Sequence, residues 1–298
     1  MRGDNMEQKK PKWMKKTYTK EDRAAIRKMN ILMKQLSLNT VCKKASCPNM
    51  GECFKKNTAT FMIMGPNCTR HCRFCNVSKE EIFPLDPKEP ENVAKASKKL
   101  GLKHIVVTSV TRDDLEDGGA HHFANTIKAL KRELPDSTVE VLIPDMKGIK
   151  ENINIIIEAK PDVINHNVET VPSLYSKVRP EANYHRSLDV LRYVKEEAPG
   201  IITKTGIMVG LGEKGEEVFA LMDDLVEIDC DILTIGQYLR PSSKHIEVKE
   251  YVTLETYDIY KKVGEEKGIK FVASSPFVRS SYHALEAVNQ VKEKEYCL

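Results

Sequence analysis

Short apolar runs alternate with longer amphipathic stretches along most of this chain. The runs are rich in Val, Ile or Thr and predict strands at 60–64, 103–109, 138–144, 162–167, 202–209 and 231–236. Stretches of helical periodicity lie between them, at about 90–100, 119–134, 147–159, 184–197 and 215–228, and another follows at about 254–267. A further helix is predicted from Glu21 to Leu36. Alternating strands and helices of this kind predict βα units and a parallel sheet.

Six βα units are too few to close an eight-stranded barrel. We therefore predict an α/β fold, a partial (βα)6 barrel that stays open. The expected organisation is an N-terminal extension at 1–57, the barrel at 58–240, and a C-terminal helix and tail at 241–298 that helps to close the mouth. Functional side chains are expected at the C-terminal ends of the strands.

Composition narrows the class of protein. The chain has 298 residues, no run of eighteen apolar residues and a polar, lysine-rich start, so we expect neither a membrane span nor a signal peptide and predict a cytoplasmic protein. Residues 1–56 hold fifteen Lys or Arg against five Asp or Glu, a net charge of +10. Such a basic end favours an acidic partner, although a solvated tail explains the first ten residues equally well.

Three cysteines follow the first predicted strand closely. Gly65-Pro66-Asn67 breaks that strand, and the sequence continues as C-x3-C-x2-C with Cys68, Cys72 and Cys75. Three thiolates can hold three corners of a [4Fe-4S] cluster and leave one iron open. The alternative is a zinc site, which prefers paired C-x2-C units and a fourth ligand; His71 is available but lies inside the loop.

A second set of three cysteines precedes the first, in the pattern C-x4-C-x5-C: Cys42, Cys47 and Cys53. Pro48, Asn49 and Gly51 indicate tight turns that would bring these sulfurs together. The two sets lie within 34 residues and account for six of eight cysteines, which in a cytosolic chain indicate metal binding or catalysis before disulfides. Cys230 and Cys297 have no obvious partner, and we interpret them as a buried thiol and a tail thiol.

These motifs resemble known ones. The first set, with Phe74 before its last cysteine, resembles the signature of the radical S-adenosylmethionine (SAM) enzymes, in which SAM chelates the open iron. The second set within A-S-C-P-N-M-G-E-C-F, the run N-H-N-V-E-T-V-P-S-L-Y-S-K-V-R-P, K-T-G-I-M-V-G-L-G-E and the terminal V-R-S-S-Y-H-A together resemble the lipoyl synthase family, from about Pro11 to Ala284. The departures are small and remove no ligand: Phe54, Arg73, Thr111 and Met146 stand where Trp, Pro, Asp and Phe are common.

The resemblance implies a reaction and its cofactors. Two [4Fe-4S] clusters and SAM would serve radical insertion of sulfur at C6 and C8 of an octanoyl chain on a carrier-protein lysine, the cluster on Cys42, Cys47 and Cys53 supplying the sulfur. The resemblance also points to a serine of R-S-S-Y as an oxygen ligand of that cluster, and we assign this role to Ser281. The alternative is that the two serines simply form a turn. The implied partners are an octanoylated carrier (glycine cleavage H protein or acyltransferase subunits of 2-oxoacid dehydrogenases), flavodoxin or ferredoxin, and an iron–sulfur carrier protein, without nucleic acid.

Candidate SAM contacts lie at the predicted strand ends and loops. Hydroxyl, amide and carboxylate groups there could hold polar atoms, an aromatic could stack near the adenine, glycine N–H groups at a helix start could hold a carboxylate, and an arginine could do the same. These candidates are Phe74, Thr108, Gly118, Gly119, Asn167, Glu169, Arg179 and Gly210, with Arg240 as a further arginine. Each also fits a solvated strand end, a core aromatic or a plain turn. His121 and His122 are interpreted as solvated residues at a helix start.

Two other functions remain open at this point. One is a two-cluster radical enzyme that inserts sulfur into a free small molecule. The other is an iron–sulfur or zinc module that binds nucleic acid through its basic N-terminus, although that segment has few interleaved aromatic residues.

Overall fold

The computed structural model describes residues 10–55 and 59–296. The expected solvated start of the chain lies almost wholly outside this part, as does the tail thiol Cys297. Within it, no helix is long and apolar enough to cross a membrane.

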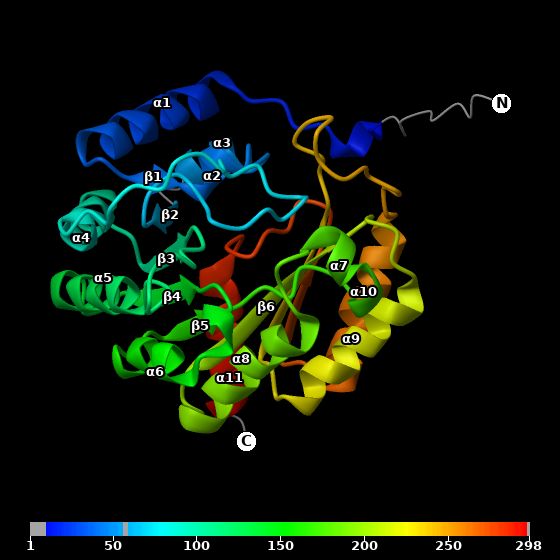
Figure 1. Ribbon diagram of the computed structural model, residues 1–298. Helices are drawn as coiled ribbons and strands as arrows, with labels where there is room; N and C mark the ends of the chain where they lie inside the picture. Colours follow the sequence, from blue (N-terminus) through cyan, green and yellow to red (C-terminus); the bar gives the residue numbers. More distant parts are fainter. Residues whose placement is uncertain (1–9, 56–58, 297–298) are drawn as a thin grey trace.

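One eight-stranded sheet organises the molecule, with its strands in chain order from β1 to β8 (Figure 1). Strands β2 to β8 are parallel, and β1 pairs antiparallel with β2. Because β1 and β8 are the two edges, the barrel is open. The strands are β1 Asn39–Thr40, β2 Thr60–Ile63, β3 His104–Ser109, β4 Thr138–Leu142, β5 Val163–Asn165, β6 Ile202–Val209, β7 Ile232–Gln237 and β8 Phe271–Ser274.

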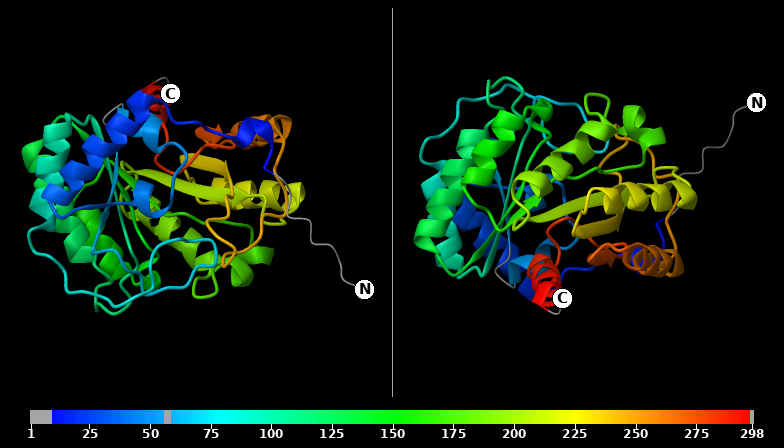
Figure 2. Two further views of the ribbon diagram at one scale, coloured as in Figure 1. Left: turned by 90° about the horizontal axis from the view of Figure 1, so that it is seen from above. Right: turned by 90° about the horizontal axis from the view of Figure 1, so that it is seen from below.

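Helices cover the outer face of the sheet (Figure 2). Those between strands are α4 Glu89–Leu100, α5 Ala120–Glu133, α6 Lys150–Glu158, α7 Tyr175–Val178, α8 Tyr184–Glu197, α9 Gly215–Glu227 and α10 Leu254–Lys267, with short 3-10 turns η2 Met146–Gly148 and η3 Pro172–Leu174. The N-terminal part adds η1 Lys12–Met14, α1 Lys20–Gln35, α2 Val41–Lys44 and α3 Met50–Lys55, and the chain ends in α11 Ala284–Tyr296. Side-chain caps fix several starts: the Thr19 hydroxyl accepts from Asp22 N, and Asn183 accepts from Arg186 N.

The predicted open α/β barrel is confirmed, and all six predicted strands are present. The structure adds a seventh parallel strand, β8, which lies beyond the predicted end of the barrel at residue 240. Only Val272 of its four residues is buried, and its apolar run is limited to the three residues Phe271, Val272 and Ala273, which is a weak signal for a core strand. Helix α11 and the two-residue β1 were also not predicted.

A buried polar cluster fills part of the barrel interior. Lys204 Nζ lies 2.9 and 3.1 Å from the two carboxylate oxygens of Glu140, and His104 Nε2 lies 3.0 Å from Glu140 Oε2. Asn165 Nδ2 donates to Glu140 Oε1 at 3.2 Å. Burial alone would raise the pKa of Glu140, but the charge of Lys204 and the bond from His104 lower it to about 2.

Replacing Lys204 with methionine should therefore destabilise the fold by about 3–5 kcal/mol, because a buried carboxylate loses its counter-charge. Urea denaturation of the reconstituted protein measures this, and Lys204→Met/Glu140→Gln should recover part of the loss. Since the pKa of Glu140 is lowered from 4.5, its stabilising contribution is present above pH 4.5 and is lost as the pH falls towards 2. Equal stability of the single variant and the parent would contradict this interpretation.

Candidate active site

A cavity of about 550 Å³ opens at the C-terminal ends of the strands, where the fold predicts function. Its wall combines strand ends with residues from both terminal extensions. Five cysteines of the two predicted sets line it: Cys42, Cys47, Cys68, Cys72 and Cys75. Residues of both sets, which are separate in the sequence, thus line one cavity.

The loop that carries the first set is anchored from several sides. Arg70, between Cys68 and Cys72, is buried and donates to both carboxylate oxygens of Asp113 at 2.6 and 2.9 Å and to Asp145 Oδ1 at 2.7 Å. Burial would raise the pKa of the Asp145 carboxyl, but the bond and charge of Arg70 hold it well below its usual range. This ion-pair network fixes the cysteine loop to the loops that follow β3 and β4.

Main-chain contacts complete that anchoring. Thr111 N donates to the Cys68 sulfur at 3.3 Å, and Arg73 N donates to the Val178 carbonyl at 2.9 Å. The loop is therefore held in place by its protein surroundings, as an arrangement of ligands for a cluster requires.

The thiols of each set lie close enough to influence one another. Burial raises the pKa of Cys72 to about 11, with Cys75 and Cys68 contributing, and it raises the pKa of Cys53 to about 12, with Cys42 and Cys47 contributing. Metal ligation requires thiolates, so bound cations would supply the charge that makes ionisation favourable. Three thiols in each set, without a carboxylate among them, fit iron–sulfur clusters. No three His, Cys, Asp or Glu side chains in residues 10–55 and 59–296 converge on a single metal ion.

The second set is built on two short helices. Cys42 lies in α2 and Cys53 in α3, with Cys47 in the connection between them. Gly51 does not form the predicted turn: it lies inside α3, where an added Cβ would be 2.8 Å from the Asp22 side chain. The glycine is thus required for the close packing of α3 on α1.

The C-terminal tail reaches this set. Asn49 Nδ2 donates to the Phe277 carbonyl at 2.7 Å, and Thr60 Oγ1 donates to the Ser281 hydroxyl at 2.7 Å. Thr60 also hydrogen-bonds the Cys42 thiol. Thr60 therefore connects Ser281 to Cys42 of the second set. In Figure 1 this segment is the orange-to-red chain between β8 and α11.

Most predicted SAM contacts line the cavity: Phe74, Thr108, Asn167, Glu169, Arg179 and Arg240. Arg179 is buried, and its Nη1 donates to the Asn167 carbonyl and the Tyr175 hydroxyl, both at 2.9 Å. Its Nε has no hydrogen-bond partner among the described residues. Burial raises the pKa of Glu169, although the charge of Arg179 opposes the shift. These groups can bind a polar ligand next to the first cysteine set.

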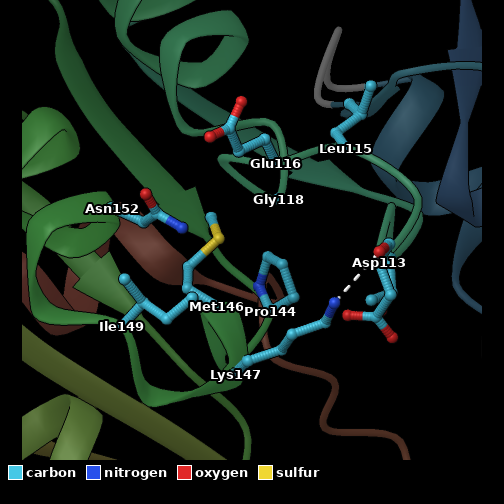
Figure 3. Close-up of a pocket in the computed structure, with 10 residues that line it drawn as sticks. Asp113, Leu115, Glu116, Gly118, Pro144, Met146, Lys147, Ile149 and Asn152 are labelled. Atoms are coloured by element: carbon cyan, nitrogen blue, oxygen red, sulfur yellow. Dashed lines mark hydrogen bonds between the residues drawn. The ribbon is translucent and has the colours of Figure 1, made fainter.

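The three predicted glycine contacts do not line the cavity. Gly118 borders a small separate pocket beside Met146 and Lys147 (Figure 3). The Gly119 N–H, predicted to hold a ligand carboxylate, already donates to Asp117 Oδ1 at 2.9 Å. Both residues have left-handed backbones, with φ of 59° and 90°, which explains glycine there.

Gly210 has a similar backbone explanation. Its φ is 91°, and an added Cβ would lie 2.3 Å from the Glu250 carbonyl oxygen. The geometry therefore does not support a ligand contact at Gly118, Gly119 or Gly210. His122 also differs from prediction, because it is buried with its Nε2 2.8 Å from Glu89 Oε2, whereas His121 is exposed.

Sequence reasoning missed several groups at this site. Arg70 and Asp145 form the anchoring network, and the lone arginine inside C-x3-C was the available signal. His166 lines the cavity, donates from Nδ1 to the Ile143 carbonyl and has a pKa lowered to about 4, first by burial and then by the charge of Arg179. It is therefore a neutral imidazole at neutral pH.

Comparisons with known proteins agree with this geometry. The Radical SAM superfamily profile matches residues 62–225. A curated lipoyl synthase from Caldanaerobacter subterraneus subsp. tengcongensis is 62% identical over 276 residues, 93% of this chain and 96% of the relative. Another, from Alkaliphilus metalliredigens, is 54% identical over 262 residues, 88% of this chain and 90% of that one. The chain belongs to the lipoyl synthase family.

As a radical SAM enzyme, a member of the lipoyl synthase family uses a [4Fe-4S] cluster and SAM. Membership confirms the predicted enzyme class. The fold is shared more widely: the crystal structure of methylornithine synthase superposes with a TM-score of 0.54 at 16% identity, over 92% of this chain and 96% of that one.

Proposed function

We propose that this member of the lipoyl synthase family inserts two sulfur atoms, at C6 and C8, into an octanoyl chain that is amide-linked to a lysine of a carrier protein. The observation that supports this most strongly is a cavity lined by all three cysteines of the first set and by Cys42 and Cys47 of the second. When bound, SAM and its cluster supply a 5′-deoxyadenosyl radical that abstracts hydrogen, and a second cluster supplies sulfur.

The protein residues take distinct roles in this proposal. Cys68, Cys72 and Cys75 hold the first cluster and leave one iron for SAM, while Asn167, Glu169 and Arg179 bind polar groups of SAM. Cys42, Cys47 and Cys53 hold the second cluster, with Ser281 as its fourth ligand. The bond from Thr60 to Ser281 supports that assignment, because Thr60 also contacts Cys42.

The chemistry needs shielding more than acid–base groups. An unactivated C–H bond has no acidic proton, so a general base would not help, and the cofactors perform the difficult step. Apolar side chains of the cavity wall, among them Met62, Ile143 and Met208, can exclude water from a reactive radical. The protein therefore acts by positioning and by exclusion of solvent.

Anaerobic incubation with SAM, a reductant and an octanoylated carrier domain tests the function. Mass spectrometry should show a carrier that has gained two sulfur atoms, and oxidation of the two new thiols to a disulfide should then remove two hydrogens. The same reaction on free octanoate, with an unmodified carrier, would favour the small-molecule alternative. Metal analysis should find about eight irons per chain and little zinc, since two [4Fe-4S] clusters contain eight irons.

The proposed partners are an acidic carrier domain, a flavodoxin or ferredoxin, and an iron–sulfur carrier protein that rebuilds the consumed cluster; the proposed location is the cytoplasm. The basic N-terminal region supports carrier docking near the cavity mouth. Lys43 is exposed on α2, and the Lys44 carbonyl accepts from Asn76 Nδ2 at 2.8 Å, which joins the two cysteine loops. Lys55 is paired with Asp22 at 3.0 Å and Lys56 lies outside the described residues, so Lys43 and Lys44 are the better test.

Carrier affinity should fall as salt is raised, because screening shortens to about 10 Å near 0.1 M. Lys43→Glu/Lys44→Glu should weaken binding by at least about tenfold at low salt, measured by calorimetry. The matched control reverses two exposed lysines on outer helices α4 and α5, Lys99→Glu/Lys128→Glu, and should bind nearly as the parent does. Equal affinities for parent and Lys43/Lys44 variant across the salt range would exclude this docking surface.

A further inference from the structure

Two adjacent serines of the tail contact opposite halves of the cavity. The Ser280 hydroxyl accepts from Asn167 Nδ2 at 2.9 Å and donates to Asn167 Oδ1 at 3.1 Å. The next hydroxyl, of Ser281, accepts from Thr60 at 2.7 Å on the side of the second cysteine set. One short stretch of backbone thus connects the proposed SAM site with the proposed sulfur source.

The amide of Asn167 has no free donor in this arrangement. Its Nδ2 donates both to Ser280 and to Glu169 Oε1, the latter at 3.1 Å, and an amide carries only two N–H groups. A ligand that accepts a hydrogen bond from Asn167 must therefore displace Ser280 or Glu169. Ligand binding and the tail contact compete for the same group.

Two strand glycines make room for this contact. An added Cβ at Gly206 in β6 would lie 2.6 Å from Thr234 Oγ1, 3.0 Å from Asn167 Oδ1 and 3.2 Å from Ser280 Oγ. At Gly236 in β7 it would lie 2.2 Å from the Val278 carbonyl oxygen. Neither glycine has a left-handed backbone, so close approach of neighbouring atoms explains both, and at Gly236 those atoms belong to the tail. The tail is packed into the barrel wall.

We propose that Ser280 is a positioning residue that couples the SAM site to the tail: a ligand that takes the Asn167 N–H now bonded to Ser280 breaks the Ser280 contact and frees the segment that carries Ser281. This inference rests on the proposed function, in which Asn167 contacts SAM. By thermodynamic linkage, the factor by which SAM weakens the contact between Ser280 and Asn167 equals the factor by which that contact weakens SAM binding. The segment that carries Ser281, the proposed ligand of the second cluster, would then loosen only when SAM is bound beside the first cluster.

The test measures binding and dynamics, without turnover. SAM affinity is determined by equilibrium dialysis of the reconstituted protein without reductant. Ser280→Ala should bind SAM about fivefold more tightly, the factor that one net hydrogen bond represents. Hydrogen–deuterium exchange at the bonded amides of Val278 and Tyr282 should accelerate with SAM in the parent. In Ser280→Ala it should be fast already without SAM.

Matched variants distinguish an error in the proposed coupling through Ser280 from an error in the proposed SAM contact at Asn167. Ser280→Thr keeps the hydroxyl and should restore parental affinity. In an Asn167→Ala background, Ser280→Ala should change nothing further. Parental or weaker SAM binding by Ser280→Ala, with iron content intact, overturns the coupling. Unchanged SAM affinity in Asn167→Ala instead overturns the proposed SAM contact.

Discussion

Cys72→Ala should reduce SAM cleavage to background. Cys72 lies in the anchored loop between Cys68 and Cys75. Among the described residues, no fourth cysteine belongs to this set and could replace it. Loss of one thiolate leaves two ligands, too few to hold a cluster that presents an open iron to SAM. The measurement is 5′-deoxyadenosine formed under dithionite, normalised to protein.

Cys47→Ala should give the complementary result. The first cluster keeps all three ligands, so some SAM cleavage continues, but the carrier gains no sulfur. Cys230→Ala is the matched control: its thiol is buried just before β7, at the opposite end of the strand from the cavity, and it should retain both activities. Lipoyl product at the parental level from Cys47→Ala would refute the second set as the sulfur source.

Ser281→Ala should separate cluster assembly from sulfur transfer. Three thiolates remain, so iron content should stay largely intact, while sulfur insertion falls by about a hundredfold or more and abortive SAM cleavage continues. Serine oxygen binds iron more weakly than thiolate does, since soft thiolates suit iron–sulfur clusters. A weak ligand that can leave would help a cluster that must give up its sulfur.

The two serines of the tail provide an internal comparison for this prediction. Ser281 faces Thr60 and Cys42, whereas Ser280 faces Asn167, so their replacements should have different effects. Near-parental lipoyl formation by Ser281→Ala, with Ser280→Ala inactive, would show that the other serine is the ligand. Full activity in both variants would remove the ligand role altogether.

The sequence predicted the elements whose burial is continuous. Strands such as β6 and β7 are buried over almost every residue, and they are rich in Ile and Thr, which favour strands. Strand β8 was not predicted because it is short and three of its four residues are only partly buried. The cysteine sets were also predictable, because their spacing and the adjacent motifs are specific.

Contacts between distant segments could not be predicted in the same way. Gly119 was interpreted as an anion site, but only the structure shows that Asp117 already accepts its N–H. The network from Arg70 to Asp145 spans 75 positions in the sequence, and the pair of Ser280 and Asn167 spans 113. Contacts between such distant positions leave no local sequence pattern, so both could be found only in the three-dimensional structure.

The most direct test of the account uses isotopically labelled sulfur. The protein is reconstituted with sulfur-34 sulfide, freed of unbound sulfide, and allowed one turnover with SAM, reductant and octanoylated carrier. Both sulfur atoms of the product should be heavy, because the cluster on Cys42, Cys47 and Cys53 is expected to supply them. Light sulfur in the product, at the abundance of sulfur in the buffer, would contradict it.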